Sequence, residues 1–343
     1  MWSFPFTLNR QGILGMNRRN VAYISRYNSR GRYPLVDNKL KTKLLAEKFN
    51  LSTPQLRAVI HYQYEIATLA RQIQSLDGFA IKPSKGTGGK GILVIKNHQE
   101  GMFVKTSGKA VTMDHIKRHL SNILAGLYSL AGSPDVAIIE DLIQPAALFE
   151  KLSFAGVPDI RIIVFKGYPV MAMLRLSTQA SDGKANLHQG AVGVGLNIAN
   201  GQCLHAVQHA RRVKQHPDTQ IPLDTIAIPD WRDLLLLAAR SYELTGLGYI
   251  GADLVVDKNR GPLLLELNAR PGLSIQIANG AGLLPRLKTI EGLDPDLIPG
   301  ADERVDFSME NFGGARSVPG REKSPGLIEA TAQRGSDSQS PLR

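Results

Sequence analysis

The stretch from Gly248 to Gly272, GYIGADLVVDKNRGPLLLELNARPG, constrains the fold of this chain more than any other. It predicts two short strands joined by a turn, with Asp253 on the first and with Glu266 and Asn268 on one face of the second. Three oxygen-bearing side chains on neighbouring strands suit a hard dication such as Mg²⁺. A hairpin with a polar outer face explains the same alternation. The metal interpretation is favoured because a carboxylate in an otherwise apolar strand needs a compensating charge.

The composition bounds the class of protein. A chain of 343 residues is long enough for about two domains. Its single cysteine, Cys203, excludes an intrachain disulfide and a cysteine-based zinc site. The first residues lack a continuous apolar signal sequence, and the longest apolar run, residues 234–239, is far below the ~20 residues of a membrane span. We therefore expect a cytoplasmic protein without a membrane span.

The formal net charge of +11 is concentrated at the front of the chain. Residues 1–50 contain ten Lys and Arg against two acidic residues. Such a block attracts nucleic acids, acidic protein tails or small anions alike. No RNA-binding fingerprint or zinc-finger spacing accompanies it, so the charge does not by itself select a partner.

A glycine-rich segment, Ser84–Gly91 in FAIKPSKGTGGKGILVI, lies between two predicted strands. Glycines let backbone N–H groups surround an anion, so the loop is either a phosphate-binding nest or an ordinary hairpin connection. It is not a Walker A loop, because Lys90 is followed by Gly91 rather than by Ser or Thr. It is not a Rossmann turn either, because a strand follows where a helix should begin.

The segment NKLKTKLLAEKF has the apolar spacing of a helix. It carries Lys39, Lys41 and Lys43, and each of these is more often a solvated side chain than a ligand. Later in the chain, the apolar residues 136–139 predict a buried strand that runs directly into Glu140–Ile143. A strand that leaves its sheet with exposed peptide groups is well placed to pair with the edge of an adenine ring.

Arg161 and Arg175 lie one on each of two predicted strands that are joined by a tight turn. Arginine within a strand commonly recognises phosphate or carboxylate through its planar fork, and the alternative is a surface salt bridge. A long polar loop with Lys184 and His188 follows, and such loops are often functional. His188 has no obvious Ser, Cys or Asp partner, so a hydrolase triad is not expected.

Taken in order, these motifs resemble the ATP-grasp superfamily and, within it, the RimK-like α-L-glutamate ligases and their related proteins. The resemblance runs from about Asp37 to Leu287. Seven motifs carry it: NKLKTK, FAIKPSKGTGGKG, IIEDLI, PDIRIIVF…MAMLRL, GKANLHQG, GADLVVD and LLELNARPG. It implies an α+β fold, the ATP-grasp fold, in which two lobes with antiparallel sheets clamp ATP.

The resemblance also implies how the chain is divided. We expect a basic N-terminal segment at 1–36, a small lobe with a glycine-rich flap at 37–143, and a large lobe with the metal site at 144–300. From Pro295 the composition turns to Pro, Gly, Ser and charge without period, which predicts a disordered tail over 301–343.

The site residues follow by position from the resemblance. The residues implied at the nucleotide are Lys39, Lys82, Ser84, Gly86, Gly88, Gly89, Lys90, Glu140, Asp141, Leu142, Ile143, Asp159, Lys184, Ala185, Asn186 and His188. The implied ligands of Mg²⁺, with Mn²⁺ as an alternative ion, are Asp253, Glu266 and Asn268. The candidates for neutralising the transferred phosphoryl group and gripping a substrate carboxylate are Arg161, Arg175 and Arg270.

The implied activity is that of an ATP- and Mg²⁺-dependent carboxylate–amine ligase. Its partners would be a carboxylic acid, such as glutamate or another amino acid, and an amine acceptor, such as a peptide or protein. RimK-like enzymes carry a full N-terminal domain, whereas 38 residues precede Lys39 here, so the acid stays open. Two alternatives also stay open: an ATP-binding sensor or scaffold without ligase activity, and a basic RNA- or ribosome-associated protein.

Overall fold

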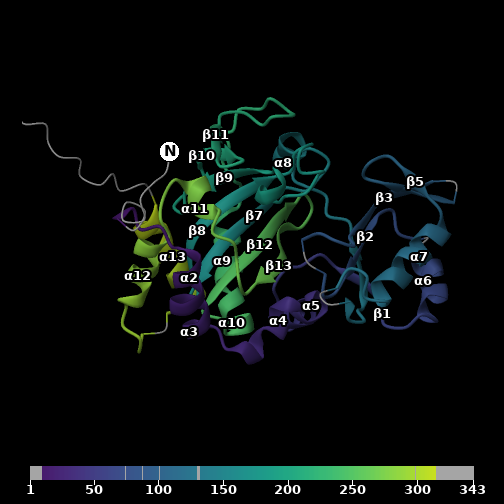
Figure 1. The fold of residues 1–343 in the computed structure, drawn as a ribbon, viewed down its shortest axis with the longest axis horizontal. Coiled ribbons are helices and arrows are strands. Elements are labelled where there is room, and N and C mark those ends of the chain that lie inside the picture. The colour runs from purple at the N-terminus through teal and green to yellow at the C-terminus, as the bar shows by residue number, and fades with distance from the viewer. Residues whose placement is uncertain are drawn as a thin grey trace, which may run out of the picture.

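Two antiparallel sheets, each with its own hydrophobic core, form a small lobe and a large lobe. The computed structural model describes residues 10–73, 75–86, 88–99, 101–129, 132–297 and 299–313. Figure 1 shows the large lobe on the left and the small lobe on the right. The predicted α+β arrangement of two antiparallel sheets is confirmed.

In the described residues, the small lobe is a six-stranded sheet of order β1-β6-β2-β3-β4-β5 with two helices. Its strands are β1 (Leu56–Ile60), β2 (Phe79–Pro83), β3 (Leu93–Gln99), β4 (Met102–Lys105), β5 (Ala110–Val111) and β6 (Ala137–Asp141). Its helices are α6 (Glu65–Ile73) and α7 (Met113–Leu124). Ile116, Leu120 and Ile123 are buried at helical spacing, so α7 presents an apolar stripe to the core.

The large lobe is a seven-stranded sheet of order β11-β10-β9-β8-β7-β12-β13. Its strands are β7 (Asp159–Phe165), β8 (Tyr168–Leu176), β9 (Val192–Leu196), β10 (Cys203–Gln208), β11 (Arg211–Val213), β12 (Tyr249–Asp257) and β13 (Gly261–Asn268). Its helical elements are α8 (Ala147–Leu152), a 3-10 turn (Leu187–Gln189), α9 (Trp231–Ala239), α10 (Ser241–Thr245), α11 (Ile275–Asn279), α12 (Leu284–Glu291) and α13 (Ala301–Phe312).

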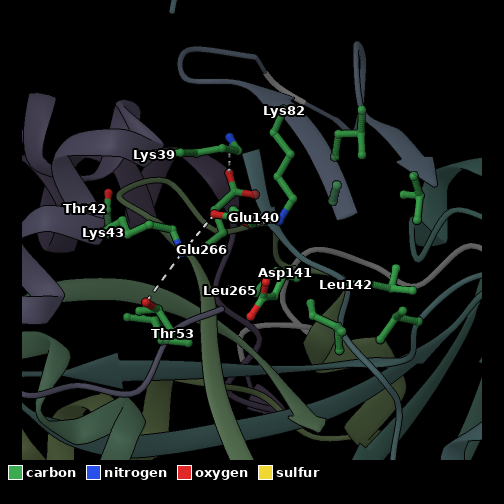
Figure 2. A pocket seen from close by; sticks show the side chains of 16 residues that line it. Lys39, Thr42, Lys43, Thr53, Lys82, Glu140, Asp141, Leu142, Leu265 and Glu266 are labelled. Carbon is green, nitrogen blue, oxygen red and sulfur yellow. Dashed lines mark hydrogen bonds and ion pairs between the residues drawn. The ribbon is translucent and has the colours of Figure 1, made fainter. Parts of the chain in front are cut away.

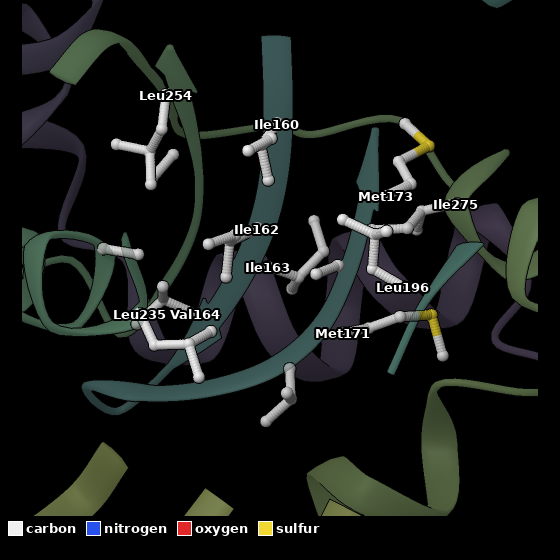
Figure 3. Packing of buried hydrophobic residues seen from close by; sticks show 14 of the residues in the cluster. Ile160, Ile162, Ile163, Val164, Met171, Met173, Leu196, Leu235, Leu254 and Ile275 are labelled. Atoms are coloured by element: carbon white, nitrogen blue, oxygen red, sulfur yellow. The ribbon is translucent and has the colours of Figure 1, made fainter. Parts of the chain in front are cut away.

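The two faces of the large sheet pack against different helices. Leu235 of α9 lies beside Val164 on one face, whereas Ile275 of α11 lies beside Met173 on the other (Figure 3). Met173 is paired with Arg161 across β8 and β7, and directly paired residues point to the same face. The face under α11 is therefore also the face that carries the charged residues of the sheet.

The hairpin predicted from Gly248–Gly272 is present as β12 and β13. Asp253 lies directly opposite Glu266, and a bulge follows between Asp253 and Leu254. Asn268 comes two residues after Glu266 and points to the same face. The three predicted ligands are thus brought together on one face of the sheet.

Residues 10–37 form a strap of short helical turns that packs on the large lobe. Its elements are α2 (Met16–Arg18), a π-helical turn (Arg19–Ile24), α3 (Ser25–Tyr27), a 3-10 turn (Arg30–Arg32) and α4 (Pro34–Asp37). The side-chain amide of buried Asn28 bonds the carbonyl and the N–H group of Tyr249 at 2.7 and 2.8 Å, and the Ala269 carbonyl at 3.3 Å. The strap thereby holds the start of β12 and the chain just after β13.

Helix α5 (Lys39–Lys48) lies between the two lobes (Figure 1). Asn38 caps its first turn with a side-chain hydrogen bond. Ala46 belongs to the core of the large lobe, although the predicted boundaries assign this helix to the small lobe. The Lys39 N–H group donates to the carbonyl of Ser84 at the base of the flap, 2.8 Å away. Helix α5 therefore joins the two lobes.

The predicted disordered tail over 301–343 is wrong for its first part, because residues 301–312 form α13. Arg304 is buried and pairs with Glu243 of α10, so the helix is tied to the large lobe. The buried apolar residues of α13 belong to the hydrophobic core of that lobe. The rest of the predicted tail, residues 314–343, lies outside the described residues.

Candidate functional site

A pocket of about 190 Å³ lies between the lobes. Figure 2 shows charged side chains converging on it from α5, β2, the end of β6 and β13. The lining residues are Lys39, Thr42, Lys43, Thr53, Ala80, Lys82, Ile92, Val94, Glu140, Asp141, Leu142, Ile143, Val157, Leu264, Leu265 and Glu266. An apolar wall beside a group of lysines suits a ligand with a flat apolar part and several negative charges.

Glu140 lies between two lysines in the pocket wall. Its carboxylate is 3.0 Å from Lys43 Nζ and 2.5 Å from Lys82 Nζ, and the three side chains are at most 10% exposed. Burial raises the pKa of Glu140, but Lys82 and Lys43 outweigh burial and hold this pKa below its ordinary value. Burial lowers the pKa of Lys43, and Glu140 opposes that shift. With both lysines charged, the cluster keeps one net positive charge.

Lys39 connects the flap to the large sheet. Its Nζ atom donates to the Gly86 carbonyl at 2.7 Å and lies 3.2 Å from Glu266 Oε1. Lys82 is the next-to-last residue of β2, just before the flap, and lines the same pocket. The structure therefore brings the two sequence-predicted lysines together on either side of the flap.

Lys43 is a pocket residue that the sequence reasoning did not single out. Leu44 and Phe49 belong to the apolar spacing of the segment NKLKTKLLAEKF, yet their side chains are 44% and 40% exposed while Lys43 is buried. The available signal was spacing: Lys43 follows Lys39 by four residues, which puts both on one helix face and leaves Lys41 on another. Two lysines on a buried helix face indicate a shared anion or carboxylate.

The predicted adenine segment Glu140–Ile143 divides into two parts. Glu140 and Asp141 still belong to β6, where their backbone is paired with β2. Leu142 and Ile143 follow the last paired residue and line the pocket, so their peptide groups are the ones placed for the polar edge of a ligand. Glu140 contributes through its side chain rather than through its backbone.

An arginine–aspartate network lies on the charged face of the large sheet. Arg161 donates to both oxygens of Asp253, at 2.6 and 2.5 Å, and Arg175 Nη2 lies 2.8 Å from Asp253 Oδ2. Arg175 also forms a bidentate pair with Asp159. The four side chains are at most 12% exposed. Their charges balance, and the aspartates fix the planes of both guanidinium groups.

The two aspartates of this network have opposite pKa shifts. Burial raises the pKa of Asp253, but Arg161 and Arg175 outweigh burial and bring it to about 2. Burial raises the pKa of Asp159 to about 6, because the attraction of Arg175 is partly offset by repulsion from Asp253. Asp253 is therefore ionised throughout the neutral range, and Asp159 is the first of the two to take up a proton as the pH falls.

Asp253, Glu266 and Asn268 keep free acceptor positions that a dication could use. The carboxylate of Glu266 is contacted by Lys39 alone within the described residues, which leaves most of its lone pairs available. Asp253 accepts three N–H contacts out of about four acceptor sites of a carboxylate. The Asn268 side-chain oxygen accepts the Arg270 N–H at 2.8 Å and retains a lone pair. This all-oxygen set fits a hard cation, with Glu266 as its least committed member.

No group of three or more His, Cys, Asp or Glu side chains in the described part of the chain is arranged to hold a metal ion. A site built only from carboxylates or imidazoles is thus absent there. A dication held by the predicted ligands would combine the two carboxylates with the Asn268 amide, and of these three residues Glu266 lines the pocket.

The flap residues predicted at the nucleotide differ in exposure. Ser84 is fully buried, and its hydroxyl has no hydrogen-bond partner among the described residues. Gly86 offers its carbonyl to Lys39. Gly88 and Gly89 have φ of +64° and +76°, and Lys90 is exposed. Left-handed glycines in an exposed loop allow the backbone to turn its N–H groups towards an anion.

Ten of the sixteen residues predicted at the nucleotide do not line this pocket: the five of the flap, Asp159, and the four in the connection between β8 and β9. Lys184 pairs with exposed Asp182 at 3.3 Å, and Asn186 caps a 3-10 turn by accepting the His188 N–H at 3.0 Å. His188 instead lines a second cavity, and Ala185 lies in the same connection between β8 and β9. A role for these residues at the first pocket requires that the connection move.

Arg270 is also separate from the arginine–aspartate network. It is 51% exposed and pairs with Asp37 of the strap at 3.0 Å, while its guanidinium lies 4.9 Å from the centre of the Tyr33 ring. In this arrangement Arg270 joins the end of the hairpin to the strap. Its predicted grip on a substrate carboxylate stays a prediction.

Replacing Gly91 with alanine should loosen the base of the flap. Gly91 has φ +75°, a Cβ atom there would lie 2.5 Å from the Tyr128 ring, and its carbonyl accepts a hydrogen bond from His119 Nε2 at 3.0 Å. We expect the free energy of unfolding to fall by about 2 kcal/mol, from left-handed strain plus the clash. Denaturant unfolding measures it. The control Gly108→Ala, with φ +80° and no atom within 4 Å, should cost about 1 kcal/mol. Equal losses of unfolding free energy in the two variants would contradict the prediction that Gly91 holds the base of the flap.

Comparison with known proteins identifies relatives of this architecture. A family model described as sugar-transfer associated ATP-grasp matches residues 18–292. The solved structure of the ATP-grasp ligase PsnB with a minimal precursor is 12% identical over 82% of this chain and 63% of that chain, with a TM-score of 0.43. D-alanyl-alanine synthetase A from Vibrio cholerae O1 biovar eltor is 10% identical over 82% and 66%, with a TM-score of 0.44. D-cycloserine synthetase DcsG is 13% identical over 88% and 82%, with a TM-score of 0.43.

The match to the family model includes both lobes, the flap and the hairpin. The chain spans 63% of the length of the PsnB chain, which is less than two thirds. No curated protein matches the sequence significantly. Within the described residues, no helix has the length and hydrophobicity needed to cross a bilayer.

Proposed function

Since the chain belongs to the sugar-transfer associated ATP-grasp family, we propose that it binds ATP between its lobes and uses it to join a carboxylic acid to an amine. The observation that carries this proposal is the convergence of Lys39, Lys43 and Lys82 with Glu266 in one pocket. Cations beside a carboxylate suit a polyphosphate together with the dication that accompanies it. The apolar wall of the same pocket suits the adenine ring.

The nucleotide would be held by groups from both lobes. Lys39 and Lys82 flank the flap and would neutralise the phosphates, while Leu142 and Ile143 would offer peptide groups to the adenine edge. The residues that would hold Mg²⁺, or Mn²⁺ as an alternative, are Asp253, Glu266 and Asn268. When bound, the ion would neutralise and align the phosphate oxygens for transfer.

The proposed reaction has two steps. A carboxylate is a poor electrophile, so transfer of the γ-phosphoryl group converts the acid to an acyl phosphate. Attack by the amine then forms the amide and releases phosphate. Arg161 and Arg175 would offer oriented guanidinium N–H groups beside these steps, because Asp253 and Asp159 hold their guanidinium planes in place. Closure of the flap would keep water from hydrolysing the acyl phosphate.

The resemblance to RimK-like ligases motivates the finer part of the proposal, in which the acid is glutamate or another amino acid and the acceptor is a peptide or protein. The basic N-terminal segment supports an RNA-associated role less well than its net charge alone suggests. Arg19 and Arg32 of the strap donate to the carbonyls of Pro271 and Thr245 of the large lobe, at 2.8 and 2.9 Å, so part of the charge serves packing.

A screen of pooled amino acids and peptides with ATP and Mg²⁺ tests the proposed function. ADP and phosphate should appear only when an acid and an amine are both present, and mass spectrometry should find a product equal to acid plus amine minus water. With an ¹⁸O-labelled carboxylate, one labelled oxygen should leave in the released phosphate. ATP binding without any product across the panel would instead favour a sensor or scaffold.

A further inference from the structure

A second cavity of about 240 Å³ lies on the large lobe and shares no lining residue with the pocket between the lobes. Three segments meet there: the 3-10 turn before β9, the turn between β10 and β11, and the start of α11. Its walls include His188, Val207, His209, Ala210, Ser274 and Ile277. None of the steps proposed for the first pocket uses these side chains.

The second cavity lies on the same face of the large sheet as the arginine–aspartate network. Arg175 is paired with Gly193 on β9, and Gly193 is paired with Val207 on β10. Directly paired residues point to the same face, so Val207 in the cavity wall shares the face of Arg175. Neighbouring strands are about 4.8 Å apart, which places the cavity roughly 10 Å from Arg175 along the sheet.

The sites follow one another across this face in strand order. Glu266 lies on β13, Asp253 on β12, Arg175 on β8 and Val207 on β10. In the proposed ligase reaction, the phosphoryl donor, the acid and the amine must also follow one another in this order. The phosphoryl group can then be transferred to the acid, and the amine can attack the product. The second cavity thus lies where the far part of the amine acceptor would reach.

The second cavity is surrounded by groups that favour an anion. His188 and His209 are exposed in its walls, and no acidic side chain is among the described residues that line it. Arg212 of the edge strand β11 is paired with Val207 and therefore points to the same face. Lys214 follows directly after β11 and is also exposed. Imidazole and guanidinium groups around a cavity whose described lining holds no carboxylate suit an oxyanion.

The turn between β10 and β11 holds its cavity residues in a strained backbone. His209 has φ +48° and Ala210 has φ +61°, and the flanking residues Gln208 and Arg211 are paired. Asn-Gly is the favoured sequence for a two-residue turn with both φ values positive. Alanine is less stable than glycine in the left-handed conformation that such a turn requires. Strained positions of this kind cluster at binding sites, and both residues line the second cavity.

We propose that the second cavity binds an anionic group, a carboxylate or a phosphate, on the amine acceptor, with His188 and His209 as its hydrogen-bond donors. The Ser274 hydroxyl offers a further donor from the start of α11. The anion site itself does not depend on the proposed ligase function. Only the assignment of the anion to the amine acceptor rests on that function. An acceptor that spans roughly 10 Å from Arg175 would fill the cavity and would use its remote anion to position the amine.

The test follows the imidazole signals of ¹³C-histidine-labelled protein while inorganic phosphate or succinate is added in the presence of saturating ADP and Mg²⁺. The nucleotide keeps the added anion away from the lysines of the first pocket. The signals of His188 and His209 should move along one saturable curve, while His61 on the small lobe should move as it does in sodium chloride of equal ionic strength. The two anions distinguish a phosphate site from a carboxylate site. Shifts of His188 and His209 no larger than in chloride would overturn the proposal.

The same titration without nucleotide separates this inference from the proposed function. The histidine signals report on the second cavity whether or not the chain binds ATP. Saturable shifts in a protein that fails to bind ATP would overturn the ligase proposal and leave the anion site standing. Absence of shifts in a protein that binds ADP would overturn the anion site alone.

Two substitutions in the strained turn separate binding from stability. Asparagine tolerates left-handed φ, so His209→Asn keeps the turn and removes the imidazole. The dissociation constant for the bound anion should rise about tenfold, while the thermal midpoint should stay the same or rise. The matched variant Ala210→Gly keeps both histidines and should leave the dissociation constant unchanged. His188→Leu removes the other donor and should weaken binding as His209→Asn does. Unchanged affinity in both histidine variants would overturn the assignment.

Discussion

Glu140→Gln is expected to lower the free energy of unfolding by about 3–5 kcal/mol. The change keeps the shape of the side chain and removes the carboxylate that Lys43 and Lys82 share. Two buried ammonium groups are then left without their common counter-charge, and their mutual repulsion is no longer offset. Denaturant unfolding followed by circular dichroism measures the loss.

An exposed ion pair and a double-mutant cycle are the controls for Glu140. Asp114→Asn removes an exposed pair with Lys117 on α7 and should cost less than about 1 kcal/mol. Adding Lys43→Met to Glu140→Gln removes one of the stranded ammonium groups. The double variant should therefore lose less than the sum of the single variants, and simple additivity would contradict the shared-carboxylate arrangement.

The contribution of Glu140 should also depend on pH. Its pKa in the folded protein is below the ordinary value of 4.5, so its carboxylate stabilises the fold fully above pH 4.5. This stabilisation is lost as the pH falls from 4.5 through the lowered folded pKa, because the carboxylate is then protonated in both states. The difference in unfolding free energy between the wild type and Glu140→Gln should accordingly shrink over that range. A difference that stays constant there would contradict the lowered pKa.

Glu266→Gln is expected to reduce ADP formation on the order of a hundredfold while changing the free energy of unfolding by less than about 1 kcal/mol. Glutamine cannot supply the negative charge that a dication between β12 and β13 needs. The structural loss is small, because Glu266 is 37% exposed and its contact is the 3.2 Å pair with Lys39. Steady-state ADP release at saturating ATP, titrated with Mg²⁺, measures the effect.

Glu150→Gln is the matched control for Glu266→Gln, because Glu150 is an exposed glutamate of α8 outside both cavities. It should leave ADP formation and stability unchanged. Full activity in Glu266→Gln at all Mg²⁺ concentrations would remove Glu266 from the metal set. An equal loss of ADP formation in both variants would show that the net charge of the protein, rather than this site, causes the effect.

The hairpin of β12 and β13 could be predicted because its information is local. The alternation of polar and apolar residues has a period of two, so it fixes both the strand and the face on which Asp253, Glu266 and Asn268 lie. The antiparallel sheets of the two lobes were implied by the family resemblance, which rests on the order of the motifs. The placement of Lys39 and Lys82 at one pocket agrees with that order.

The partners of the charged residues could not be predicted, because they come from distant parts of the sequence. Arg161 was expected to face a ligand, yet its partner is Asp253, which is 92 residues away and lies opposite it in the sheet. Glu140 was expected to act through its backbone, and only the packing of α5 against the large lobe shows that its side chain meets Lys43.

The C-terminal helix shows how composition can mislead. Residues 301–312 lack a strong apolar period and precede a polar segment, so disorder was predicted from residue 301. Helix α13 forms because tertiary contacts supply what its own pattern lacks: Arg304 is buried against Glu243, and Phe312 reaches the core of the large lobe. Local patterns contain no trace of these contacts.

Calorimetric titration with ATP tests most directly whether the pocket between the lobes is a nucleotide site. In excess Mg²⁺ we expect one ATP per chain, with affinity falling about tenfold or more when a chelator removes the metal. Lys39→Met should weaken binding by a similar factor, because its ammonium group joins the flap to Glu266, whereas Lys41→Met on the exposed face of the same helix should bind as the wild type does. Absence of ATP binding, or equal affinities in Lys39→Met and Lys41→Met, would contradict the assignment of this pocket.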